Sequence, residues 1–155
     1  MPAGPQREGR REAGNSGGVG MKLLRIGEVS LLTYGPNKLF DITEKMAQLA
    51  RGVAEGVLLL QAVGSTGALL LLPRDQRILD SYEHDLWDLV ETLGWRHPGN
   101  AYAHLRSTLI GTILALPIVG GEIPLNGMGV FFLENQPAFN RRRKIVAAVA
   151  AANAP

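Results

Sequence analysis

Glycine, proline and asparagine divide this chain into short apolar segments, and this division constrains the fold more than any other feature. The chain has 155 residues, 19 of them Gly and 9 Pro. Its longest apolar runs, at residues 57–60, 68–72 and 109–119, are shorter than the roughly 20 residues that a membrane-spanning helix needs. Pro117 also interrupts the last run. We therefore expect a soluble domain with many short strands.

The apolar and β-branched runs that end at turn residues predict strands. Two of these runs flank the connection at residues 64–67, Gly-Ser-Thr-Gly, which has the composition of a hairpin turn. We therefore expect the strands on either side of this connection to pair with each other. The predicted strands cover residues 23–34, 57–63, 68–72, 113–119, 121–125, 130–134 and 143–149.

Helical periodicity occurs in three places. Asp41 followed by Glu44 predicts a capped helix start, and an apolar stripe of period 3.6 predicts the longest helix over residues 75–93. A shorter helix is expected over residues 100–109. Because strands and helices do not alternate regularly, we predict the α+β class, with a mixed or mainly antiparallel sheet of about seven strands and two or three helices.

The chain length favours one domain, and composition separates this domain from the N-terminus. Residues 1–20 are polar and rich in Gly and Arg, with too little apolar surface to offset the entropy of ordering. We expect a disordered extension there, without a secretory signal, and a folded domain over residues 21–155.

Charge and cysteine content exclude several classes of function. The net charge is only +2, which gives no broad electrostatic footprint for nucleic acid or an anionic membrane. The chain has no cysteine, which excludes disulfides, thiolate metal sites and a cysteine nucleophile. This composition permits a cytoplasmic location, which we expect.

Two of the three histidines, His97 and His104, lie close together in the sequence. On a helix that begins near Asn100, His104 lies one turn after the helix start. There it can share a site with His97 and Asn100. Imidazole ligates metals and transfers protons near neutral pH. Alternatively, Asn100 caps the helix, His97 is a loop residue and His104 is partly buried. His84 is expected on a helix surface, with Asp88 as an ion-pair partner.

Two further segments allow both a binding and a structural interpretation. The connection at residues 64–67 could cradle a phosphate with its amides and the hydroxyls of Ser65 and Thr66, or form a plain tight turn. The basic side chains Arg141 and Arg143 could bind phosphate or contact another subunit. They could equally stand at a solvated strand entrance, where alternate side chains point to opposite faces.

The stretch from residue 97 to residue 111 resembles a pattern of the YjbQ-type family. That pattern is a His, a short loop, and then Asn-Ala-x-Ala-His-Leu-(Lys/Arg)-x-(Ser/Thr)-Leu-x-Gly. The resemblance covers residues 21–150. It includes residues 41–43 (Asp-Ile-Thr), 56–58 (Gly-Val-Leu), 85–86 (Asp-Leu), Glu134 and the basic run 141–144.

The resemblance implies an α+β fold, a homotrimer, a histidine pocket for a metal or an anion, and weak thiamine phosphate synthase activity. That reaction joins a pyrimidine pyrophosphate to a thiazole phosphate, so the site must stabilise departing pyrophosphate, normally with cations. The cations available in this chain are His97, His104, Arg106 and the arginines of residues 141–143.

We therefore expect a phosphate-handling site with His104 as its catalytic residue. A divalent metal, loosely held, would be bound by His97 and His104, and a small phosphorylated molecule or anion by other side chains. Where the family has a His and an acidic residue, this chain has Gly64 and Pro73. The alternative is a non-catalytic trimeric relative. The expected ligand-binding residues are Ser65, Thr66, Asn100, Arg106, Glu134, Arg141 and Arg143.

Overall fold

The computed structural model describes residues 20–152, and in this part of the chain three helices accompany seven strands, which confirms the α+β class. The predicted extension at residues 1–20 lies outside the described residues, apart from Gly20. The elements are β1 (Met21–Gly35), β2 (Lys38–Asp41), α1 (Thr43–Leu49), β3 (Gly56–Ala62), β4 (Gly67–Pro73), α2 (Gln76–Asp88), α3 (Ala101–Ile110), β5 (Ile113–Ile118), β6 (Met128–Glu134) and β7 (Ala138–Ala152).

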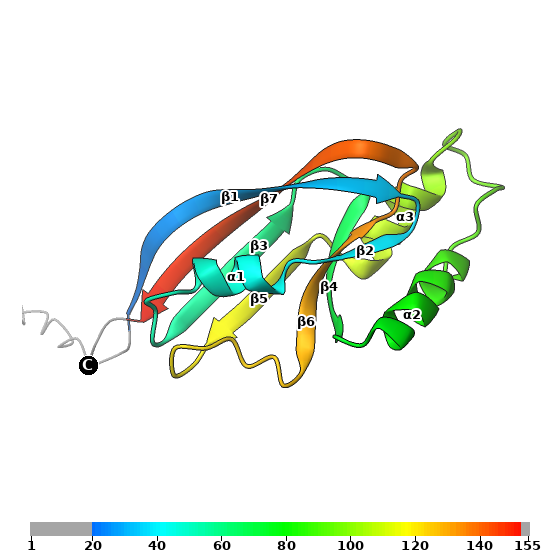
Figure 1. Cartoon of the computed structure of the whole chain (residues 1–155). Coiled ribbons are helices and arrows are strands. Elements are labelled where there is room, and N and C mark those ends of the chain that lie inside the picture. Colours follow the sequence, from blue (N-terminus) through cyan, green and yellow to red (C-terminus); the bar gives the residue numbers. More distant parts are fainter. Residues whose placement is uncertain (1–19, 153–155) are drawn as a thin grey trace, which may run out of the picture.

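The strands form two antiparallel sheets rather than one. The larger sheet has the order β1-β7-β3-β5, and the smaller has the order β2-β6-β4. Figure 1 shows β1 and β7 as two long, curved neighbours. The larger of two core clusters contains residues of both sheets and of α1. It includes Leu58, Ile118 and Val149 of the larger sheet, Leu69 and Phe132 of the smaller sheet, and Met46 of α1. The burial of this apolar surface stabilises the domain.

The predicted hairpin across residues 64–67 is wrong. β3 pairs with β5 and β7, whereas β4 pairs with β6, so the chain leaves one sheet at this connection and enters the other. Both sheets contribute to the shared core at this point: Leu58 and Leu60 from β3 in the larger sheet, and Leu69 from β4 in the smaller sheet. Turn composition could not reveal this, because the same residues serve a hairpin and a crossing between sheets.

Among the other predicted elements, one strand is absent, one helix is shorter than expected and the last strand is longer. Residues 121–125 form no strand, since Gly120 and Gly121 have φ of +58° and +82° and only an isolated bridge joins Val119 to Glu122. Helix α2 begins as predicted, with the Asp75 side chain accepting a hydrogen bond from the Arg77 backbone (2.9 Å), but it ends at Asp88 rather than at residue 93.

The start of α1 also differs from the predicted capping box. The Asp41 carboxylate accepts hydrogen bonds from the Thr43 backbone (2.9 Å) and hydroxyl (2.5 Å), and the helix begins at Thr43. Glu44 lies 3.5 Å from Arg74 instead of closing the box. Although partial burial raises the pKa of Asp41, the hydrogen bonds from Thr43 and Arg74 outweigh burial and hold this pKa below its ordinary value.

Helices α2 and α3 gather at one end of the molecule (Figure 1). Helix α3 packs against β4, and the Leu69 backbone donates a hydrogen bond to the Gly111 oxygen just after the helix (3.0 Å). This contact fixes the C-terminal end of α3 against β4. Within residues 20–152, no helix has the length and apolar composition to cross a membrane.

Candidate functional site

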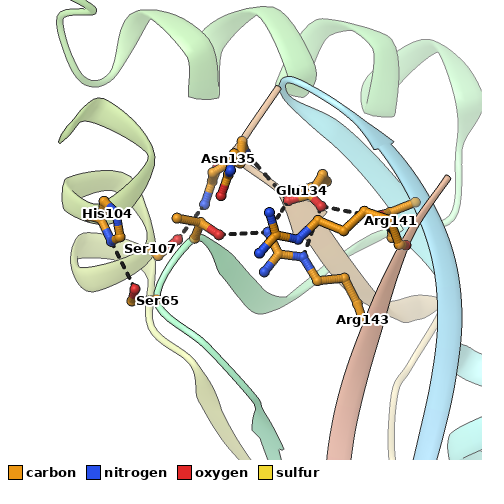
Figure 2. Close-up of polar contacts among 10 residues, drawn as sticks. Ser65, His104, Ser107, Glu134, Asn135, Arg141 and Arg143 are labelled. Carbon is orange, nitrogen blue, oxygen red and sulfur yellow. Dashed lines mark hydrogen bonds and ion pairs between the residues drawn. The ribbon is translucent and has the colours of Figure 1, made fainter. Parts of the chain in front are cut away.

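The structure brings His97, His104 and Ser65 together at the surface of the domain. The Ser65 hydroxyl lies 2.8 Å from His104 Nδ1, a hydrogen bond that Figure 2 shows between the connection and α3. The ring centre of His97 lies 5.3 Å from that of His104. Ser65 therefore lies beside His97 and His104, although it is distant from them in sequence. The chemical role of these residues remains a prediction.

Local structure explains the position of His104. Gly99 has φ of +78°, which turns the chain into α3. The Asn100 backbone oxygen accepts hydrogen bonds from the Ala103 (3.0 Å) and His104 (3.5 Å) amides. The neighbouring Tyr102 and Ala103 are buried, and His104 lies half-buried at the edge of the packed face. It can therefore contact both the protein and a ligand.

The connection at residues 64–67 is held in place from two sides. Arg143 donates to the Thr66 hydroxyl (2.7 Å), and the Asn135 backbone donates to the Thr66 oxygen (3.1 Å). The Asn135 side chain also donates to the Ser107 hydroxyl of α3 (2.8 Å; Figure 2). Asn135 thus fastens the connection and α3 to the same point at the end of β6, which fixes the position of Ser65 relative to His104.

Glu134 and Arg143 form a buried ion pair beneath the connection. Arg143 Nε donates to Glu134 Oε1 (2.9 Å), and a second contact joins the guanidinium to the other carboxylate oxygen. Glu134 also accepts a hydrogen bond from the Thr33 hydroxyl (2.8 Å). The two side chains are 0% and 3% exposed, so they neutralise each other inside the protein. With Thr66 also buried, three of the expected ligand-binding residues are occupied by internal contacts.

Arg106 points into the fold rather than toward the histidines. Its fully buried guanidinium donates to the Trp87 backbone oxygen (2.9 Å) and the Asn37 side chain (3.4 Å). The guanidinium also lies 4.9 Å and 5.6 Å from the ring centres of Trp87 and Tyr102. Burial lowers the pKa of Arg106, while Tyr102 acts in the opposite direction. This expected ligand-binding residue is a packing residue in the described fold.

The remaining expected residues lie near the surface. Asn100 and Arg141 are half-buried, and the Arg141 backbone oxygen accepts a hydrogen bond from the Thr33 hydroxyl (3.3 Å). His84 lies exposed on α2, where the sequence placed it.

A cavity of about 470 Å³ opens beside the two histidines. Trp95 and Arg96 belong to its lining, and sequence reasoning passed over both. The only signal for them was their position directly before His97. The cavity combines imidazoles and a guanidinium with an apolar wall, and is lined by Gly94, Trp95, Arg96, His97, Ala101, His104 and Leu105.

A metal could use only part of this arrangement. Among residues 20–152, no three or more His, Asp or Glu side chains are grouped closely enough to hold an ion. His97 and His104 can supply two ligands, because imidazoles that bind one zinc at about 2 Å have ring centres about 5 Å apart. Gly64 cannot easily supply a third, since its φ of +104° disfavours any L side chain.

Comparison with protein-family models gives a match to UPF0047 protein YjbQ-like over residues 27–152. A UPF0047 protein of Archaeoglobus fulgidus is 27% identical over 124 residues, which cover 74% of this chain and 94% of that relative.

Solved structures show the same fold at low sequence identity. A YbjQ-like protein of unknown function from Sulfolobus solfataricus matches with a TM-score of 0.78 and 22% identity, covering 85% of this chain and 99% of that protein. A hypothetical protein from Aeropyrum pernix matches with a TM-score of 0.75 and 24% identity, covering 81% and 98%. At these identities the likeness extends to the fold alone.

Proposed function

The chain belongs to the YjbQ-like UPF0047 family, and we propose that it handles a small phosphorylated molecule at the cavity beside His97 and His104. One observation carries the proposal: two imidazoles 5.3 Å apart share a cavity with the Arg96 guanidinium, and Ser65 orients one of them. Grouped donors that carry or can acquire positive charge suit a phosphate. The proposal includes a cytoplasmic location, which a chain without cysteine permits.

The contact between Ser65 and His104 suits the imidazole to proton transfer. When the serine hydroxyl donates to Nδ1, the ring proton lies on Nε2, and this nitrogen can donate to a phosphate oxygen. His104 would then be the catalytic residue that stabilises or protonates a departing phosphate group. In the other tautomer Nε2 can ligate a divalent metal with His97, with water completing a loosely held shell.

The enzymatic form of the proposal is weak thiamine phosphate synthase activity, and the rival form is a non-catalytic relative that binds an anion. The buried state of Arg106 and Arg143 favours the rival, because neither guanidinium is free to stabilise departing pyrophosphate. An assay of thiamine phosphate formation from the two phosphorylated precursors separates them. Turnover that His104→Ala abolishes supports the enzyme, and phosphate binding without turnover supports the binder.

Replacing His104 with alanine should weaken binding of inorganic phosphate by about 1–3 kcal/mol, the scale of one charge-assisted hydrogen bond. Calorimetric titration of the full chain measures this loss. The melting temperature should change little, since His104 is half-buried and lies at the edge of the packed face. His84→Ala is the matched control and should leave the affinity unchanged. Equal affinity in the two variants would remove His104 from the site.

We also propose that the chain forms a homotrimer. The 15-residue strand β1 is an edge of the larger sheet and exposes apolar side chains, with Ile26 at 65% and Leu32 at 60%. Such an edge is a template for association unless it is covered. Sedimentation equilibrium should return three times the chain mass of 16.7 kDa. A monomer at all protein concentrations would contradict this prediction.

A further inference from the structure

The hydrogen bond between Ser65 and His104 has the geometry that joins a serine nucleophile to its general base. The serine oxygen lies 2.8 Å from His104 Nδ1, and Figure 2 shows the two side chains pointing toward each other. When Ser65 donates this hydrogen bond, Nδ1 is unprotonated and can accept the serine proton. Phosphate binding at the imidazole leaves the serine hydroxyl only a positioning role, so its nucleophilic chemistry is unused.

Ser65 is both accessible and held by an anchored backbone. Ser65 is exposed, whereas the next residue, Thr66, is buried. Arg143 donates to the Thr66 hydroxyl (2.7 Å), and the Asn135 backbone donates to the Thr66 oxygen (3.1 Å). An exposed hydroxyl on a fixed backbone is preorganised for attack, because little conformational freedom is left to lose in the transition state.

Donors for a developing negative charge lie beside the serine oxygen. Within residues 20–152, no backbone oxygen accepts a hydrogen bond from the amide of Ser65 or of Thr66. Serine hydrolases stabilise the oxyanion of the tetrahedral intermediate with the amide of the nucleophile or of the residue after it. Arg96 lines the same cavity as His104 and adds a positive charge nearby. A carbonyl group attacked by Ser65 therefore has donors for its oxygen.

The surroundings of the pair favour an uncharged ester as the substrate. The cavity that His104 lines has an apolar wall, which includes Trp95, Ala101 and Leu105. Such a wall suits the carbon chain of a small molecule. In the part of the chain that the structure describes, no carboxylate hydrogen-bonds to His104. The pair therefore lacks the third member of a triad, and we expect slow hydrolysis that is easiest to detect with activated esters.

We propose that Ser65 and His104 form a catalytic dyad that hydrolyses carboxylic esters, an activity distinct from phosphate handling. The Ser65 oxygen attacks the carbonyl carbon of the ester while His104 Nδ1 takes the serine proton. The bond from this carbon to the alcohol oxygen then breaks, and His104 gives its proton to the departing alcohol, which leaves an acylated serine. Water attacks the acyl carbon with His104 again as base, and the carboxylic acid is released as Ser65 regains its proton.

Hydrolysis of p-nitrophenyl acetate by the full chain tests the dyad. Ser65→Ala and His104→Ala should each lower the rate at least about tenfold, and the double variant should be no slower than either, because the two residues act as a unit. Ser81→Ala is the matched control and should keep the rate. Ser81 is exposed on α2, and its hydroxyl donates to the Arg77 backbone oxygen (3.2 Å).

Covalent modification of the wild type gives a second measurement that needs no variant. Peptide mapping by mass spectrometry should find an acetyl group on Ser65 after reaction with p-nitrophenyl acetate, and a sulfonyl group there after phenylmethanesulfonyl fluoride. The chain has no cysteine, so thiol acylation cannot account for the reaction. A rate that Ser65→Ala leaves unchanged, or the absence of both modifications from Ser65, overturns the dyad.

Phosphate titration of the same variants separates this inference from the proposed function. Ser65→Ala should bind inorganic phosphate within about threefold of the wild type, because His104 and Arg96 remain in the cavity. Ester hydrolysis that depends on Ser65, in a chain that does not bind phosphate, supports the dyad and overturns the phosphate site. Phosphate binding without modification of Ser65 by either reagent does the reverse.

Discussion

Replacing Glu134 with alanine is expected to lower the free energy of unfolding by about 3–5 kcal/mol, because it leaves the Arg143 guanidinium charged and unpaired in the interior. The pair is 0% and 3% exposed, so water cannot replace the lost carboxylate without opening the fold. Thr33 also loses the nearer of the two acceptors of its hydroxyl. Urea denaturation measures the change, which is a large part of the stability of an ordinary domain.

Two comparisons identify the buried charge as the cause. Lys38→Ala removes a surface partner of Glu83, with the lysine 44% exposed, and should cost no more than about 1 kcal/mol. The double variant Glu134→Leu with Arg143→Met removes both charges and should recover much of the loss. A Glu134→Ala protein as stable as Lys38→Ala would show that the buried pair does not carry the predicted energy.

The sequence determined most of the elements but not how they are paired. The apolar stripe of residues 75–93 predicted α2, because helical periodicity is a local property of the sequence. The partner of β3 is not local. Leu58 lies opposite Val149 of β7, more than half the chain away, and the intervening turn residues fit several pairings equally well.

In the candidate site, too, local features could be predicted from the sequence, whereas contacts between distant residues could not. His97, Asn100 and His104 could be grouped from helical spacing alone, and the structure places their stretch at one end of α3. Arg143 was expected to bind a ligand, with a solvated strand entrance as the alternative. The sequence could not show that Arg143 points into the interior and pairs there with Glu134 of the other sheet. Burial decides between ligand binding and packing, and burial follows from the tertiary fold.

The second large effect on stability is expected from replacing Arg106. This substitution tests directly whether a buried arginine serves packing or ligand binding. If the guanidinium is a packing group, Arg106→Ala should lower the free energy of unfolding by about 2–4 kcal/mol. The lost hydrogen bonds to a charged group and the lost contacts with two aromatic rings account for this figure, offset in part by the relieved burial of charge. The backbone oxygens of Trp87 and Val90 at the end of α2 would lose their donor.

The same substitution should leave ligand binding at the histidines nearly intact. Below the melting temperature, Arg106→Ala should bind inorganic phosphate within about twofold of the wild type, because Arg106 is fully buried while His104 lies at the edge of the packed face. Arg74→Ala is the control for losing an arginine, since Arg74 is 43% exposed and its surface ion pairs should contribute about 1 kcal/mol or less. An Arg106→Ala protein with wild-type stability and lost phosphate binding would instead make Arg106 a ligand residue. That result would require the end of α2 to move away from α3 when the ligand binds, because the carbonyls of Trp87 and Val90 now hold the guanidinium.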